Sequence, residues 1–132
     1  MGLKEDILAA KDLKREMVTV PEWSCTVSVK SMTALERDAW ENGWLQFRQR
    51  VNGDEKDTTH FHAYLLLHVM LDADGAPILQ NDVDVVALSG KSIVAIMRVV
   101  RVAYRLNGIG QQQEDAQEKN SASVPAGGSL TA

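Results

Sequence analysis

The apolar residues of this chain change their spacing near residue 31, and this change limits the folds open to it. Between residues 17 and 30, apolar residues alternate with polar ones, and Pro21-Glu22 divides the stretch into two runs. A period of two over two short runs predicts a β-hairpin with one buried face. From residue 34 onward, apolar residues recur every three or four positions, which is the spacing of an amphipathic helix. A hairpin followed by helices predicts an α+β fold.

The first long helix is expected from about residue 34 to residue 51. Thr33 and Glu36 form a capping-box sequence at its start. Its large apolar residues fall on one stripe and are expected to face the core: Trp40, Trp44, Phe47 and Val51. Gly43, in the middle, costs about 1 kcal/mol relative to Ala and indicates either a close helix contact or a weak point.

Further helices are expected on both sides of this one. A short amphipathic helix over residues 3–13 is expected to cover the core as a lid. The polar segment 52–59 predicts an exposed loop. Three more helices are expected: a buried one over 60–71, a short one over 82–88 capped by Asn81, and a last one over 91–106 ended by Asn107-Gly108. The predicted fold is therefore α+β and mostly α-helical, an N-terminal β-hairpin packed with about four to five helices.

The composition changes abruptly after Gly110. Residues 111–132 are rich in Gln, Gly and Ser, and Val124 and Leu130 are their only large aliphatic residues. Such a segment buries too little apolar surface to offset its ordering entropy. We expect one folded domain over residues 3–110 and a disordered tail over residues 111–132.

Charge and hydropathy exclude several classes of partner. The chain carries 14 Lys and Arg against 18 Asp and Glu, a net charge of −4, which argues against nucleic acid binding. Its longest apolar run, residues 63–71, is far below the roughly 20 residues that span a bilayer. The acidic N-terminus is unlike a signal peptide, so a cytosolic protein with no membrane partner is expected. The single cysteine, Cys25, lies on the apolar face of the hairpin and is interpreted as a small buried hydrophobe rather than a reactive thiol.

Residue types that often carry chemistry do not form a recognisable site. His60 and His62 would point about 200° apart on a helix, and no acid nearby completes a metal site. His68 is interpreted as a hydrogen-bonded histidine at the edge of the core. Asp72-x-Asp74-Gly75 is similar to part of a calcium loop but lacks its later ligands, which favours a turn. We expect no catalytic residues, no metal and no cofactor, and hence no enzyme.

The last helix carries the candidate binding surface. A core-facing side is expected from Ile93, Ile96, Met97, Val100, Ala103 and Tyr104. Outside that side lie Val94, Val99, Val102 and Leu106, around a row of Arg98, Arg101 and Arg105. Three arginines on one face indicate either a solvated, salt-bridged face or, with exposed aliphatic neighbours, a protein–protein interface. The candidate partner-binding residues are Arg98, Arg101, Arg105, Val94 and Val102.

The order of these elements resembles the tail assembly chaperones of long-tailed, lambdoid bacteriophages. The resemblance lies in LKEDILAA at residues 3–10, VPEW at 20–23 with VSVK at 27–30, and MTALERDA at 32–39. It continues through LDxDG at 71–75, Asp82-Val83, Leu88 and Lys91-Ser92, and ends with RLNG at 105–108. It covers most of residues 3–110, and its motifs are structural signatures rather than catalytic ones.

The resemblance implies a role in phage morphogenesis. A member of this family binds and solubilises the tape measure protein in the host cytoplasm, helps recruit tail tube subunits, and is absent from the mature virion. The resemblance also implies self-association and association with a longer product made by ribosomal frameshifting. The alternatives are a minor structural or connector protein that stays in the tail, and a nucleic-acid-binding regulator, which would need a basic face.

One stretch of the tail fits the expected frameshift. Glu118-Lys119-Asn120 can be encoded as GAA-AAA-AAY, on which two tRNAs can slip back one base and pair again. Lys119 and Asn120 are therefore the candidate frameshift position, and a Lys119 codon of AAG would remove the site. Residues 121–132 would then be a by-product of the in-frame short form.

Overall fold

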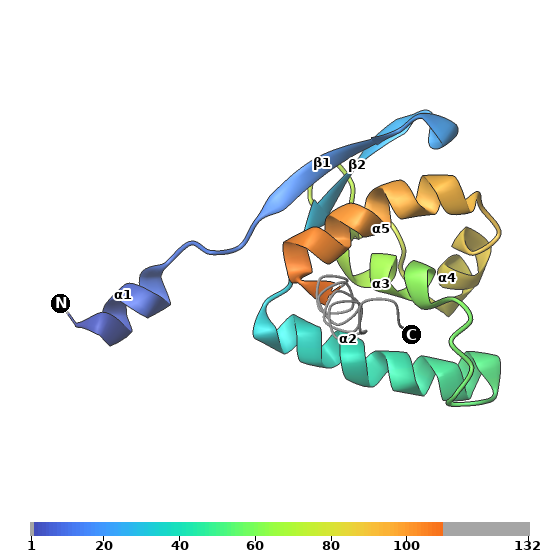
Figure 1. The fold of residues 1–132 in the computed structure, drawn as a ribbon, viewed down its shortest axis with the longest axis horizontal. Helices are drawn as coiled ribbons and strands as arrows, with labels where there is room; N and C mark the ends of the chain where they lie inside the picture. Colours follow the sequence, from blue (N-terminus) through green and yellow to red (C-terminus); the bar gives the residue numbers. More distant parts are fainter. Residues whose placement is uncertain (1, 110–132) are drawn as a thin grey trace, which may run out of the picture.

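The β-hairpin is the first element of the folded body and lies along the last helix. The structure is a computed structural model that describes residues 2–109 (Figure 1). In that range the elements are α1 (Leu3–Ala9), β1 (Arg15–Val20), η1 (Pro21–Trp23), β2 (Cys25–Lys30), α2 (Ala34–Phe47), η2 (Arg48–Asn52), α3 (Phe61–Val69), β3 (Met70–Leu71), α4 (Asp82–Leu88) and α5 (Ile93–Asn107). Five helices and an antiparallel sheet of order β1-β2-β3 confirm the α+β, mostly helical fold.

The hairpin buries one face against α5, as its alternating sequence predicts. Val18 lies opposite Val27 in the register, and Val20 opposite Cys25. The buried valines of this face are Val18, Val20, Val27 and Val29. Cys25 itself is exposed, so its interpretation as a buried hydrophobe is wrong. Cys25 is the first residue of β2 and directly follows Ser24, which has a left-handed conformation (φ 53°), at the hairpin tip. Its cross-strand partner Val20 is fully buried, so the alternating pattern alone does not decide which residues of the tip the core covers.

The third strand was not expected. The predicted helix over residues 60–71 ends at Val69, and Met70 and Leu71 leave the helix to pair with Val29 and Ser28 of β2. The segment therefore supplies both a core helix and an edge strand. Leu71 also forms an isolated bridge with Pro77, which closes the turn containing Gly75 (φ 87°).

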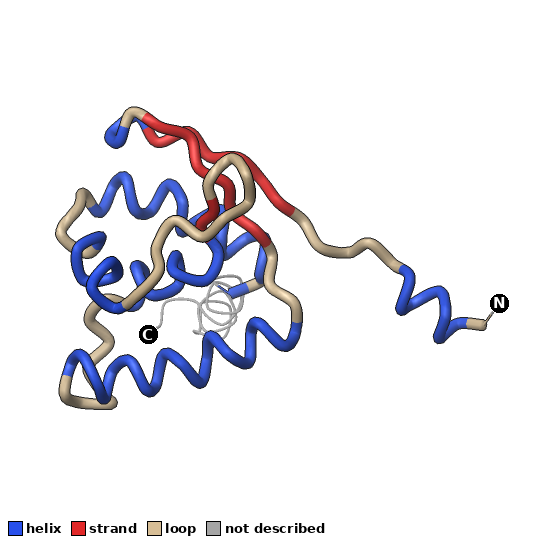
Figure 2. The backbone as a smooth tube through the Cα atoms, turned by 180° about the vertical axis from the view of Figure 1, so that it is seen from behind, coloured by secondary structure: helices blue, strands red, loops and turns tan. Residues whose placement is uncertain are grey.

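Helix α2 crosses the side of α3 opposite α5, so that α3 lies between them (Figures 1 and 2). Its capping box is present: the Glu36 amide donates to Thr33 Oγ1 at 3.0 Å, and the Thr33 amide donates to Glu36 Oε1 at 2.9 Å. The buried stripe is Trp40, Trp44 and Phe47. The α-helix ends at Phe47, and Val51 lies half-buried in the π-helical turn η2, so the helical stretch runs one residue beyond its expected end.

Gly43 marks a close approach of α2 and α3. A Cβ built at this position would overlap the Oη of Tyr64, a buried residue of α3. The first of the two interpretations of Gly43, a close helix contact, is therefore confirmed. Tyr64 also packs against Phe47, with ring centroids 4.9 Å apart, and against Trp44 at 5.6 Å. This aromatic group joins the two helices.

Helix α1 stands apart from the body, so the expectation of a lid is wrong. It contains no buried residue, and Leu3, Ile7 and Leu8 are 76%, 62% and 75% exposed. Residues 10–14 are extended and connect it to β1, and Figures 1 and 2 both show it projecting beyond the end of the hairpin. The amphipathic spacing correctly predicts a helix, but spacing alone does not say which surface covers its apolar side.

Some expectations concern parts of the chain beyond this range. The tail over residues 111–132, and with it Lys119 and Asn120, lies outside the described residues. Among residues 2–109, no helix has the length and apolar character needed to cross a membrane.

Candidate partner-binding surface on α5

Helix α5 is held at both ends by local sequence. Ser92 Oγ accepts from the amides of Val94 and Ala95, and Gly108 (φ 65°) ends the helix in the left-handed conformation that a glycine adopts without strain. The predicted helix is thus confirmed, shifted by one or two residues. Its fully buried side consists of Ala95, Ile96, Val99, Val100 and Ala103.

The buried side of α5 contains partly different residues from those expected. Val99 is fully buried, whereas Ile93, which was expected to face the core, is 60% exposed. Met97 and Tyr104 are half-buried. The physical reason is that α5 packs against α3 on one side and against the hairpin on the other, so it buries a wider surface than a helix covered from one side only.

A row of solvent-facing residues runs the length of α5. Val94, Arg98, Arg101 and Arg105 follow one another at spacings of three and four, and all are exposed. Val94 is 56% exposed, whereas Val102 is half-buried beside the row. The structure therefore brings four of the five candidate residues into one exposed stripe and places the fifth at its edge. We call Val94, Arg98, Arg101 and Arg105 the α5 stripe.

Two arginines of the α5 stripe bind the hairpin. Arg98 donates from Nε to Glu22 Oε1 and from Nη2 to Glu22 Oε2, both at 2.8 Å. Arg105 donates to both carboxylate oxygens of Glu16, at 3.0 and 2.7 Å. These bidentate hydrogen bonds lower the pKa of both glutamates, and they raise the pKa of both arginines. The salt-bridged interpretation of the row therefore holds for these two arginines.

Arg101 lies between the two ion pairs and differs from them. It is exposed, and within residues 2–109 it forms no ion pair or side-chain hydrogen bond. An arginine whose donors are not already used is better able to meet an acidic or carbonyl group of another protein. Arg101 and Val94 are thus the members of the α5 stripe that are available for a partner.

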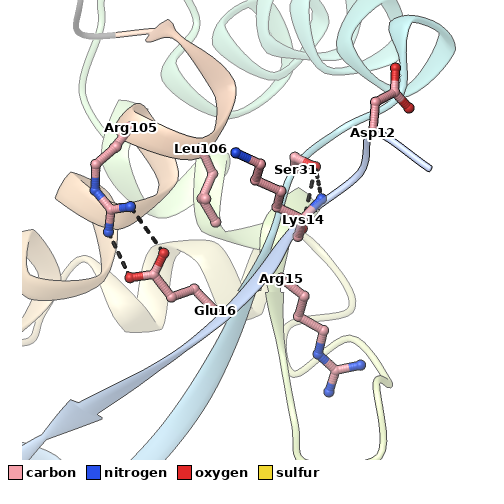
Figure 3. Close-up of a pocket in the computed structure, with 7 residues that line it drawn as sticks. All are labelled: Asp12, Lys14, Arg15, Glu16, Ser31, Arg105 and Leu106. Carbon is pink, nitrogen blue, oxygen red and sulfur yellow. Dashed lines mark hydrogen bonds and ion pairs between the residues drawn. The ribbon is translucent and has the colours of Figure 1, made fainter. Parts of the chain in front are cut away.

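A polar hollow of about 630 Å³ lies beside the last turn of α5 (Figure 3). Its lining residues are Asp12, Lys14, Arg15, Glu16, Ser31, Arg105 and Leu106. The Lys14 amide donates to Ser31 Oγ at 2.8 Å, which fixes the start of the hairpin to the end of β2. Five of the seven lining residues carry charge, so this hollow does not suit an apolar side chain.

A second hollow, of about 540 Å³, lies at the other end of α5 and is different in character. Ile93 and Ile96 of α5, Phe61 and Ala63 of α3, and Trp44 of α2 line it, together with Thr58, Thr59, His60, His62 and Ser89. None of its lining residues is Asp, Glu, Lys or Arg. We call it the apolar pocket. Sequence spacing does not reveal it, because its walls come from three helices and two loops.

The histidines do not form a site. His60 Nδ1 is 2.7 Å from Ser89 Oγ, and burial lowers the pKa of both His62 and His68. The expected hydrogen bond of His68 is not found: its Nε2 is buried without a partner among the described residues. In residues 2–109, no three His, Cys, Asp or Glu side chains lie close enough to hold a metal ion.

Comparison with known proteins identifies the architecture. No protein-family profile and no curated protein sequence matches the chain. Among solved structures, it is similar to the tail assembly chaperone of bacteriophage HK97, with a TM-score of 0.50 and 19% sequence identity, over 78% of this chain and 91% of that one. The chain therefore has a fold shared with a phage tail assembly chaperone. This is the fold class that the sequence resemblance implies, and here it is found from the coordinates.

Proposed function

We propose that this chain is a phage tail assembly chaperone that binds and solubilises the tape measure protein during tail morphogenesis. The observation that carries the proposal is the shared fold, which extends over nearly the whole length of the HK97 chaperone. The proposal includes a role in recruiting tail tube subunits, self-association, and association with a longer frameshifted product. It places the chain in the host cytoplasm and outside the finished virion.

The α5 stripe is the surface proposed to meet the client. An exposed aliphatic residue at one end, Val94, and Arg101 near the middle, which has no ion-pair partner within residues 2–109, allow apolar and charge-assisted contacts on one helix face. The ion pairs of Arg98 with Glu22 and of Arg105 with Glu16 join the stripe to the hairpin. A small surface of this kind supports weak, reversible contacts, and many such contacts along a long helical client add up to firm binding.

Co-expression tests the proposal directly. The tape measure protein of the same phage is produced alone, with this chain, and with a double variant carrying Val94→Asp and Arg101→Glu. The control is Lys56→Glu, which makes the same charge change as Arg101→Glu but in the exposed loop after η2. We expect soluble client with the unchanged chain and with the control, and at least a tenfold loss of soluble client with the double variant.

The outcomes test the chaperone function and the role of the α5 stripe separately. If the client is equally soluble without this chain, the chaperone function is wrong. If the double variant rescues the client as well as the unchanged chain does, the function stands and the α5 stripe is not the client surface. Mass spectrometry of purified virions adds a further check, because finding this chain in them would favour the structural or connector protein.

A further inference from the structure

Helix α5 carries a second row of residues, which shares Arg101 with the α5 stripe. Ile93, Met97 and Arg101 follow one another at spacings of four, so they form one ridge along the helix. Ile93 is 60% exposed, Met97 is half-buried and Arg101 is exposed, so another protein can contact all three. The row begins at the apolar pocket, because Ile93 is one of the residues that line it. We call Ile93, Met97 and Arg101 the α5 ridge.

The apolar pocket suits a single large apolar side chain. Trp44 and Phe61 form an aromatic wall, with ring centroids 5.4 Å apart in an edge-to-face arrangement. Trp44, Ala63 and Ile96 are buried, so core packing holds the walls in place. The volume of about 540 Å³ lies within the range of about 300–1,000 Å³ that is usual for ligand pockets. An aromatic wall and a lining without Asp, Glu, Lys or Arg favour an aromatic or aliphatic side chain over a charged one.

The other end of the α5 ridge favours an acidic group. Ion pairs with the hairpin neutralise Arg98 and Arg105. Of the three arginines of α5, only Arg101 lacks an ion-pair partner among residues 2–109. A carboxylate that meets Arg101 therefore gains a charge-assisted, bidentate contact without displacing an existing one. The charge left on this face selects an acid.

The length of the α5 ridge sets the spacing that a partner helix needs. Ile93 and Arg101 are eight residues apart, about 12 Å along the helix. On a second helix that packs nearly parallel to α5, two turns, or about seven residues, cover about 11 Å and return to the same face. Met97 lies midway, where a residue one turn from the pocket would contact it. Its flexible thioether side chain adapts to apolar neighbours of different shape.

We propose that the apolar pocket and the α5 ridge together bind an amphipathic helix with a defined pattern. The pattern is a large apolar residue, a second apolar residue four positions away and an acid seven positions away in the same direction. The large residue enters the pocket, the second covers Met97, and the acid binds Arg101. The inference rests on the proposed function in assigning this helix to the client. A long client that repeats the pattern binds many chains, although each contact is weak.

Binding of a synthetic helical peptide to the full chain, measured by fluorescence anisotropy, tests the proposal. The labelled probe has roughly 20 residues, mostly Ala and Gln, so that it is helical. It has Phe at its centre, and on both sides Leu four positions and Glu seven positions away, so either orientation fits. A matched peptide moves each Glu to the fifth position, which turns it about 140° from the Phe. We expect saturable binding of the probe below about 1 mM, and binding of the matched peptide at least tenfold weaker.

Variants of the chain locate the contact. Arg101→Glu and Ile93→Asp should each weaken probe binding at least tenfold. Ile93→Asp places an acid in the first turn of α5, where the helix dipole favours it, so the fold is retained. The controls Lys56→Glu, in the loop after η2, and Leu35→Asp, in the first turn of α2, should bind like the unchanged chain. A probe with Lys in place of Glu should bind the Arg101→Glu chain at least tenfold more tightly than it binds the unchanged chain.

Three results would overturn the proposal. The first is no saturable binding of the probe by the unchanged chain, and the second is equal binding of the probe and the matched peptide. The third concerns α1, whose Leu3 and Ile7 are exposed and apolar. A chain with Leu3→Asn and Ile7→Asn should bind the probe like the unchanged chain, and tenfold tighter binding would show that α1 itself occupies the pocket.

Co-expression with the tape measure protein tests the proposed function separately. Rescue of that client by a chain that does not bind the probe would remove the recognition pattern and leave the chaperone function standing. Probe binding with the expected effects of Arg101→Glu and Ile93→Asp, but without rescue of the client, would support the recognition pattern and remove the function.

Discussion

Replacing Gly43 by Ala should destabilise the protein, although Ala is the better helix former. In an exposed helix this change gains about 1 kcal/mol. Here the new Cβ overlaps Tyr64 Oη, while the next ring atom, Cζ, is 3.5 Å away. Overpacking a well-packed contact costs about 1–3 kcal/mol, and a steric cost of about 2–3 kcal/mol leaves a net loss of about 1–2 kcal/mol. Urea unfolding followed by fluorescence of the buried Trp40 and Trp44 measures it.

Tyr64→Phe provides the control, because it removes the one atom that overlaps. In that background the remaining contact at 3.5 Å is ordinary, so Gly43→Ala should gain about 1 kcal/mol instead of losing stability. The double-mutant cycle should therefore give a coupling energy of about 2–3 kcal/mol. If Gly43→Ala were stabilising in the unchanged chain, or if its cost were the same in both backgrounds, the close approach of α2 and α3 would not be what requires glycine.

Two further predictions concern stability. Asn107→Leu should cost about 2–3 kcal/mol in urea unfolding, because Asn107 Oδ1 accepts from the Met32 amide at 2.6 Å and Nδ2 donates to the Lys30 and Ala103 carbonyls; a loss below about 0.5 kcal/mol would contradict this. The pKa of His68 is lowered below 6.5, first by burial and then by Lys30, so the unfolded chain binds more protons and stability should fall as pH drops below about 6.5. His68→Gln should weaken that fall between pH 7.5 and pH 5.5, and an unchanged slope would contradict it.

Sequence reasoning succeeds where local chemistry decides the structure. The capping box at Thr33, the Asn81 cap and the Asn107-Gly108 stop each act over a few residues, and the helices that they bound are found within a few residues of their expected ends. The hairpin is equally local, because its alternating residues and its turn are adjacent in the chain.

The failures have a common physical origin in distant parts of the chain. Met70 and Leu71 form a strand because β2, about 40 residues earlier in the chain, has an edge free to pair with them. The helix propensity of residues 60–71 contains no information about that edge. The partners of Arg98 and Arg105 lie 76 and 89 residues away. One signal was present: Glu16 shares the alternating face of Val18 and Val20, and an acid on an apolar face indicates a cation opposite.

The hydrogen bonds at the end of β2 determine how the chain tolerates additions. Ser31 Oγ accepts a hydrogen bond from the Lys14 amide, and the amide of the next residue, Met32, donates to Asn107 Oδ1. The chain therefore joins the folded body and leaves it at neighbouring points. A body closed in this way is suited to circular permutation, with residues 14 and 109 joined by a short linker and new ends in the exposed loop 53–58. Sequence added before Lys14 or after Ile109 leaves the Gly108 cap and the core contact of Ile109 in place.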